Sequence, residues 1–148
     1  MKILDEILLI KLAEQAKTSS RKRTHYNFHP SLEDSTQRLC VVIEPGSYIR
    51  PHRHSNPAKW ELFFALKGSA LILIFDSSGK VINRQIISGT GPAHAAEIPE
   101  NAWHTLTALE SGTVLFEIKP GPYAPPSPDE FATWAPEEGT AEAQKIEA

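Results

Sequence analysis

Short β-rich runs, each closed by Gly, Pro, Asn, Asp or Ser, fill the chain from residue 37 onward and restrict its fold more than any other feature. Runs of this length at this spacing are typical of a β-sandwich or a closed barrel. Together they predict an all-β domain. The runs cover residues 38–44, 47–54, 60–66, 70–75, 81–87, 94–98, 105–109 and 114–119.

Outside these runs the chain predicts three further parts. Aliphatic residues at helical spacing predict a short amphipathic helix, followed by a basic connector, within residues 1–22. Residues 26–30 are expected to form a loop or an edge strand. Residues 23–136 form the predicted barrel, including an extended Pro-rich stretch after Lys119. Residues 137–148 carry little apolar surface and predict a disordered tail.

Composition narrows the classes of function. The chain has 148 residues, a size that one domain with one core accommodates. Its single cysteine, Cys40, excludes an internal disulfide. A net charge of -3 gives no general attraction to nucleic acid or to an anionic membrane. We therefore expect a cytoplasmic protein that binds neither of these partners.

Histidines two residues apart give the chain its clearest chemical signal. On a regular strand His52 and His54 point to the same side, and Glu61 and His104 follow on later runs. Three imidazoles and one carboxylate suit a divalent Zn, Fe, Mn, Ni, Co or Cu ion better than Mg or Ca. The simpler alternative is a strand of solvated histidines with one surface carboxylate, but it leaves their joint spacing unexplained.

The spacing of these residues resembles the first motif of the cupin superfamily. In that motif a glycine precedes His-x-His by five residues, and a second glycine follows the glutamate after six. Gly46 and Gly68 keep both spacings around His52, His54 and Glu61, while the gap between His54 and Glu61 is about two residues longer than in the family. The resemblance implies a double-stranded β-helix, the jelly-roll barrel of cupins, with these side chains as metal ligands.

The second cupin motif is kept less completely. Pro99 and His104 have the expected spacing, but Asn101 replaces the inner glycine, Ala93 the leading glycine and Ala108 the final asparagine. None of these departures removes a metal ligand.

A narrower resemblance links the chain to small WbuC-type cupins, which are encoded among O-antigen sugar genes in some bacteria. It rests on residues 52–54, 59–63, 103–105 and 119–123 and covers about residues 23–136. It implies a link to O-antigen or polysaccharide biosynthesis and a sugar or nucleotide-sugar derivative as the substrate.

Further candidate site residues follow from strand parity and charge. Tyr48 and Arg50 share the predicted strand face of the two histidines, so both are candidates for substrate binding inside the cavity. His94 is either a further group in the cavity or a residue of its rim. Arg21 and Arg23 are either a solvated connector or an anion clamp over the mouth of the barrel.

The residues leave the reaction open. One hypothesis is a metalloenzyme that isomerises or epimerises a small polar, anionic molecule; another is a metal-dependent module that binds such a ligand without turnover. With Fe(II) a dioxygenase is a third. Catalytic residues remain unknown, because no general acid or base stands out beyond the ligand set. Aliphatic residues between Ile3 and Leu12 exceed what a small barrel needs to cover one seam, which predicts a homodimer.

Overall fold

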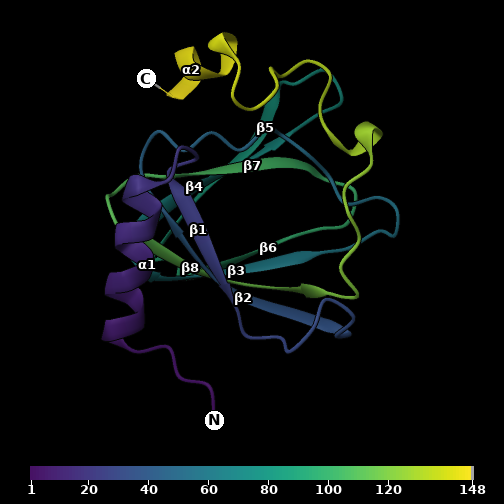
Figure 1. Ribbon diagram of the computed structural model, residues 1–148. Coiled ribbons are helices and arrows are strands. Elements are labelled where there is room, and N and C mark those ends of the chain that lie inside the picture. The colour runs from purple at the N-terminus through teal and green to yellow at the C-terminus, as the bar shows by residue number, and fades with distance from the viewer. Residues whose placement is uncertain (148) are drawn as a thin grey trace.

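The computed structural model describes residues 1–147 and shows two antiparallel sheets that face each other. The larger sheet has five strands in the order β1-β2-β8-β3-β6, and the smaller has three in the order β5-β4-β7 (Figure 1). The all-β prediction with a short N-terminal helix is confirmed. The strands are β1 (Arg23–Asn27), β2 (Thr36–Ile43), β3 (Glu61–Lys67), β4 (Ser69–Phe75), β5 (Val81–Ser88), β6 (Ala95–Ile98), β7 (Trp103–Ala108) and β8 (Thr113–Pro120).

Every predicted run except 47–54 overlaps one of these strands. Residues 47–54 form an irregular extended segment with an isolated bridge at His52. Pro51 lies at its centre and has no N–H to donate to a regular ladder. The prediction of a regular strand at 47–54 is therefore wrong.

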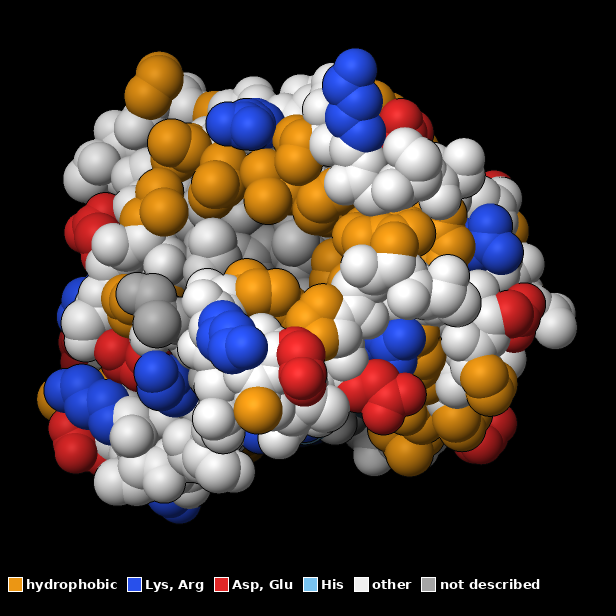
Figure 2. All heavy atoms as spheres, turned by 90° about the horizontal axis from the view of Figure 1, so that it is seen from above, with side chains coloured by type: hydrophobic (Ala, Val, Ile, Leu, Met, Phe, Trp, Pro, Cys, Tyr) orange, Lys and Arg blue, Asp and Glu red, His pale blue; other side chains and the backbone are white. Residues whose placement is uncertain are grey.

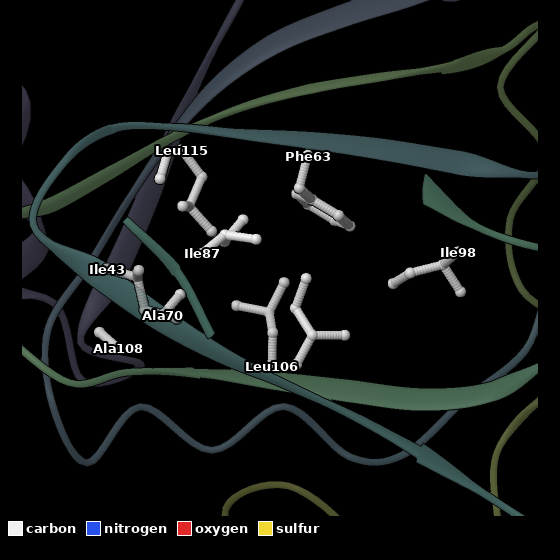
Figure 3. Close-up of a cluster of buried hydrophobic side chains, with 10 residues drawn as sticks. Ile43, Phe63, Ala70, Ile87, Ile98, Leu106, Ala108 and Leu115 are labelled. Carbon is white, nitrogen blue, oxygen red and sulfur yellow. The ribbon is translucent and has the colours of Figure 1, made fainter. Parts of the chain in front are cut away.

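Between the sheets lies a core of interdigitating aliphatic side chains. Alternate residues of each strand point inward, as Leu106 and Ala108 do on β7. Figure 3 shows the cluster, to which Ile43, Phe63, Ala70, Ile87, Ile98 and Leu115 also belong.

Helix α1 (Glu6–Thr18) packs against the outer face of β1 and β2. Asp5 caps its N-terminus by accepting a hydrogen bond from the backbone N–H of Leu8 at 2.9 Å. Leu12 and Ala16 are buried against Cys40 and its neighbours on β2 and β8. On the helix Ile7 and Ile10 are exposed, and so is Ile3 in the segment before it.

Two glycines of the first motif occupy turns that require them. Gly46 has φ +78° and Gly68 has φ +68°, in the left-handed region that side chains with a Cβ disfavour. At Gly68 a Cβ would also lie 2.6 Å from Thr113 Oγ1. The motif spacing thus marks the turns that begin and end the ligand-bearing region.

The C-terminal extension crosses the surface and then returns to the barrel. It contains a short 3-10 helix at Pro128–Glu130, and Trp134 packs on Phe75 at 5.0 Å between ring centroids. Helix α2 (Ala141–Glu147) follows where the sequence predicted a disordered tail. Ala143 is fully buried and the Thr140 hydroxyl accepts from its N–H, which explains the order. No helix among residues 1–147 is long and apolar enough to cross a membrane.

Candidate metal centre

The ligand-bearing segment 47–54 lies beside β7 and extends the smaller sheet at one point. The His52 N–H donates to the His104 carbonyl at 3.0 Å, and the His104 N–H donates to the His52 carbonyl at 2.9 Å. On the other side the segment is bonded to the C-terminal extension, through Arg53 N–H to Glu130 O and Ala132 N–H to Pro51 O, both at 2.9 Å. His52 is therefore held from both sides despite the irregular backbone.

Side chains from both sheets converge at this point. Glu61 begins β3 in the larger sheet, whereas His104 lies on β7 in the smaller one. One donor atom from each of His52, His54, Glu61 and His104 can be chosen so that all lie within 4.8 Å of one another. The cluster is thus compact enough to hold one divalent ion.

Backbone carbonyls orient two of the imidazoles. His52 Nδ1 lies 3.0 Å from the Arg50 carbonyl, and His104 Nδ1 lies 2.9 Å from the Ala102 carbonyl. A carbonyl only accepts, so each Nδ1 carries a proton, and in the neutral imidazole that binds a metal each Nε2 presents a lone pair. Metal-binding histidines are commonly oriented by a hydrogen bond of this kind.

The carboxylate of Glu61, which has no proton to donate, faces the Nε2 atoms of His104 and His54. His104 Nε2 lies 2.8 Å from Glu61 Oε2, and His54 Nε2 lies 3.0 Å from Glu61 Oε1. His54 Nε2, His104 Nε2 and Glu61 Oε2 are buried without a hydrogen-bond partner. With the His104 proton on Nδ1, two acceptors oppose each other across 2.8 Å, and a bound cation would satisfy both. The donor set therefore fits a transition metal.

Burial keeps the cluster in the protonation state that a metal requires. Burial first, and then the neighbouring His104, lower the pKa of His52 to about 3. For Glu61 burial favours the neutral acid, but contacts with His104, His54 and Lys119 outweigh it and hold its pKa well below the ordinary value. Near neutral pH the side chains are thus a neutral imidazole and a carboxylate.

Two charged residues of β8 adjoin the cluster. Lys119 Nζ lies 3.2 Å from Glu61 Oε1 and 2.7 Å from Glu117 Oε1. Burial, reinforced by the charge of Glu61 and opposed by Lys119, raises the pKa of Glu117 to about 7. Burial would lower the pKa of Lys119, but the two carboxylates outweigh it and raise this pKa. Glu117 can therefore gain or lose a proton near neutral pH beside the cluster.

A cavity of about 230 Å³ opens next to these groups. His52, Glu61 and His104 form one part of its wall, and Glu117 and Lys119 another. His25, Arg21 and Arg23 line it from β1 and the residues before it. The cluster therefore borders open space, unlike a structural zinc site closed by protein on every side.

Tyr48 and Arg50 do not line this cavity. The Tyr48 hydroxyl donates to the Pro136 carbonyl at 2.9 Å, and Tyr48 belongs to a separate, apolar cavity of about 580 Å³. Arg50 donates to the Ala132 carbonyl at 2.8 Å and lies 3.6 Å from Glu137. The alternation of side chains along a regular strand predicted both residues beside the metal. This prediction is wrong because residues 47–54 do not form a regular strand.

Of the remaining candidates, only the arginines reach the cavity. His94 is exposed in the loop before β6, next to Gly91, and is absent from the cavity wall. Arg21 and Arg23 line the cavity, and both bind the carboxylate of Glu138. The basic cluster thus lies where an anion clamp was predicted, with a carboxylate of the same chain in it.

Sequence reasoning missed Lys119 and the carboxylate of Glu117 as parts of the site. Alternation along β8 placed Glu117 opposite Phe116 and Ile118, but without the topology neither face could be assigned to the cavity. The only sequence signal was a pair of charged residues two apart, 117 and 119, within an otherwise apolar run.

Comparison with known proteins agrees with this architecture. The sequence matches a family model described as a domain of unknown function, DUF6016, over residues 4–87. The chain belongs to this family. The match covers α1 and β1–β4 with three of the four cluster residues, and the family description assigns no activity. No curated protein matches the chain.

Solved structures show where the fold belongs. TT1209 from Thermus thermophilus aligns with a TM-score of 0.55 and 20% identity over 81% of this chain and 97% of its own. KdgF from Halomonas sp. aligns with a TM-score of 0.54 and 15% identity over 72% and 85%. The E162A mutant of Bacillus subtilis oxalate decarboxylase OxdC aligns with a TM-score of 0.50 and 20% identity over 62% of this chain and 22% of that one. These structural similarities confirm the cupin jelly-roll fold. At sequence identities this low they show a shared fold and do not show a shared activity.

Proposed function

We propose that the chain is a metal-dependent cupin enzyme that acts on a small, polar, anionic molecule by proton transfer. His52, His54, Glu61 and His104 would hold one divalent transition-metal ion. The single observation that carries this proposal is the opposed lone pairs of Glu61 and His104, buried at 2.8 Å and bordering a cavity. A bound ion would supply Lewis-acid polarisation of a substrate carbonyl or hydroxyl oxygen.

The residues of β8 support catalysis over simple binding. General acid–base catalysis is most efficient when the pKa of the group is near the working pH, and Glu117 has a pKa of about 7 in the cavity wall. Lys119 contacts Glu117 and stabilises its ionised form. In our proposal Glu117 takes a proton from the substrate and returns it, as an isomerase or epimerase requires.

Cavity size restricts the substrate. At about 230 Å³ the cavity is smaller than the roughly 300 Å³ at which sites for drug-sized ligands begin. A monosaccharide derivative or a small sugar acid suits this volume, whereas the nucleotide of a nucleotide sugar would extend outside. The WbuC-like segments around both histidine motifs favour a sugar, and with it a role in polysaccharide biosynthesis.

Metal content tests the ligand assignment. We expect protein purified without added metal to contain close to one transition-metal ion per chain by elemental analysis, and His54→Ala to lose most of it. His94→Ala is the matched control, because it removes an exposed imidazole outside the cluster. Full metal content in His54→Ala would refute the assignment.

Substitution of Glu117 separates an enzyme from a binding module. Glu117→Gln keeps the shape of the side chain but removes the proton-transfer group. We expect it to retain the metal and the thermal stabilisation by small sugar acids, and to lose turnover. If small sugar acids stabilise the wild-type protein but none of them is converted, the protein is better described as a binding module without catalytic activity.

A further inference from the structure

Two arginines at the metal cavity hold a carboxylate of the chain's own C-terminal segment. Arg21 Nε and Nη2 donate to the two oxygens of Glu138 at 2.6 and 3.1 Å. Arg23 Nη2 lies 2.8 Å from both oxygens. Both arginines also line the cavity that contains His52, Glu61 and His104. The same two arginines therefore contact Glu138 and line the cavity that the candidate metal centre borders.

Arg23 is fixed in place by groups other than Glu138. Its Nη1 donates to the Tyr48 carbonyl at 2.9 Å and to Ser47 Oγ at 3.1 Å, and its side chain is only 12% exposed. These bonds join the edge strand β1 to the segment that carries His52. The guanidinium is thus positioned before any anion binds, which lowers the entropic cost of binding one.

We propose that Arg21 and Arg23 form an anion-binding subsite of the metal cavity, in which Glu138 is an intramolecular substitute for the carboxylate or phosphate of a ligand. Paired guanidinium groups recognise either anion through the same bidentate hydrogen bonds. This subsite rests on the proposed function for its role in substrate binding, but its affinity for an anion does not depend on a metal.

The contacts of Glu138 with the two arginines are weak enough for a ligand anion to replace it. Its side chain is 31% exposed, and Arg21 is 62% exposed, so water screens their ion pair. Although burial opposes ionisation, the hydrogen bonds and charges of Arg21 and Arg23 together outweigh it and lower the pKa of Glu138, so it is an anion near neutral pH. The helix that follows, α2, has seven residues and leaves Ile146 60% exposed. Of the apolar side chains of α2 only the small Ala143 is buried, so little apolar packing opposes release of this segment.

A tethered carboxylate competes with any free anion for the arginines. Because it is joined to the same chain, it acts at a high effective concentration and weakens the apparent affinity for a ligand. Removing its charge should expose the subsite without altering the arginines. Partly exposed ion pairs of this kind are weak, so we expect a gain in affinity of about fivefold.

Anion titration of the full chain, stripped of metal, tests the proposal. Inorganic phosphate is titrated by calorimetry into wild type, Glu138→Gln and Glu137→Gln. Glu137→Gln is the matched control: it removes the same charge one residue away, from a side chain that is 76% exposed and contacts Arg50 instead. We expect Glu138→Gln alone to bind phosphate about fivefold more tightly, and Arg21→Met in that background to abolish most of the gain. Acetate in a second series shows whether the subsite prefers a carboxylate.

Hydrogen exchange of the wild-type chain gives an independent readout. Saturating phosphate is expected to increase amide exchange in residues 137–147 by releasing Glu138. In calorimetry, an equal gain in phosphate affinity in Glu137→Gln, or no gain in Glu138→Gln, would overturn the proposal. In hydrogen exchange, unchanged exchange of residues 137–147 at saturating phosphate would also overturn it. Since no metal is present, a chain that fails to bind metal would leave these results intact, and failure of the subsite would leave the metal assignment intact.

Discussion

Two buried glutamates of this protein predict opposite effects of the same substitution. Glu61 and Glu130 are 3% and 4% exposed, respectively. Glu130 accepts backbone hydrogen bonds from Ser55 at 2.7 Å, from Asn56 at 3.1 Å and from Ser127 at 3.0 Å. Glu61 receives one hydrogen bond, from Lys119, and faces two imidazole nitrogens. Glutamine should therefore be tolerated at position 61 and not at 130.

In the metal-free protein Glu61→Gln replaces an acceptor by a donor. Its amide can donate to His104 Nε2, where two lone pairs now lie 2.8 Å apart. One new hydrogen bond stabilises by about 1 kcal/mol, which corresponds to roughly 3 °C in melting temperature for a chain of this size. Lys119 keeps its ion pair with Glu117 at 2.7 Å. We expect metal-free Glu61→Gln to melt about 3 °C above metal-free wild type.

Added metal should reverse the order of the two proteins. An ion at about one hundred times its dissociation constant stabilises wild type by about 2.7 kcal/mol, or roughly 8 °C, and Glu61→Gln by little. Glu130→Gln is the control: a single amide oxygen cannot accept all three backbone bonds, so it should cost about 2 kcal/mol with and without metal.

Scanning calorimetry of the three proteins, before and after addition of a divalent metal, measures these shifts. A metal-free Glu61→Gln that melts as far below wild type as Glu130→Gln does would refute the opposed lone pairs. If added metal raises the melting temperature of Glu61→Gln as much as that of wild type, the ion is held without Glu61.

Three further predictions concern other parts of the molecule. The pKa of His52 is about 3 in the folded chain and near 6.5 when unfolded, so the unfolded state binds a proton that the folded state refuses between these values. Protonation of Glu117, whose pKa is raised to about 7, stabilises the folded state over the same pH range and would mask this loss. Metal-free Glu117→Gln lacks that opposing titration and should lose up to about 1.4 kcal/mol of stability per pH unit as pH falls below about 6.5; equal urea stabilities of this variant at about pH 7.5 and 5.5 would contradict this. Ile7 is 80% exposed beside Ile3 and Ile10, so Ile7→Glu should convert the proposed homodimer to a monomer in light scattering; a monomeric wild type would disprove the dimer. Burial raises the pKa of Cys40 to about 11, so iodoacetamide at about pH 8 should leave the native thiol unmodified, and rapid alkylation would contradict its burial.

Much of the fold could be predicted because its signals are local. Turn residues separate the strands, and the glycines at 46 and 68 are required by positive φ angles. The helix follows from its aliphatic spacing and from the Asp5 cap. The convergence of the four cluster residues was also predictable, because the motif spacing implies the barrel that brings them together.

The rest of the site depends on contacts that spacing does not encode. Tyr48 and Arg50 were placed by strand parity, which fails where Pro51 interrupts the ladder and the extension supplies the bonds instead. The role of Glu117 depends on which face of β8 meets the other sheet. Glu138 lies 115 residues from Arg23, in a segment whose composition alone predicted disorder.

The backbone ladder around His52 ties the metal cluster to the end of the chain. Residues 51–53 are bonded to β7 on one side and to residues 130–132 on the other. Neither residues 51–53 nor residues 130–132 form a regular strand, so each depends on the other for its hydrogen bonds, and the two should open together as one cooperative unit. The position of His52 in the cluster therefore depends in part on hydrogen bonds from the C-terminal extension to Pro51 and Arg53. On the face that carries α2, apolar side chains gather around a hollow (Figure 2). Loss of the extension would remove Trp134 and Pro136 from the apolar cavity and, at the same time, the backbone hydrogen bonds of Pro51 and Arg53 on one side of His52.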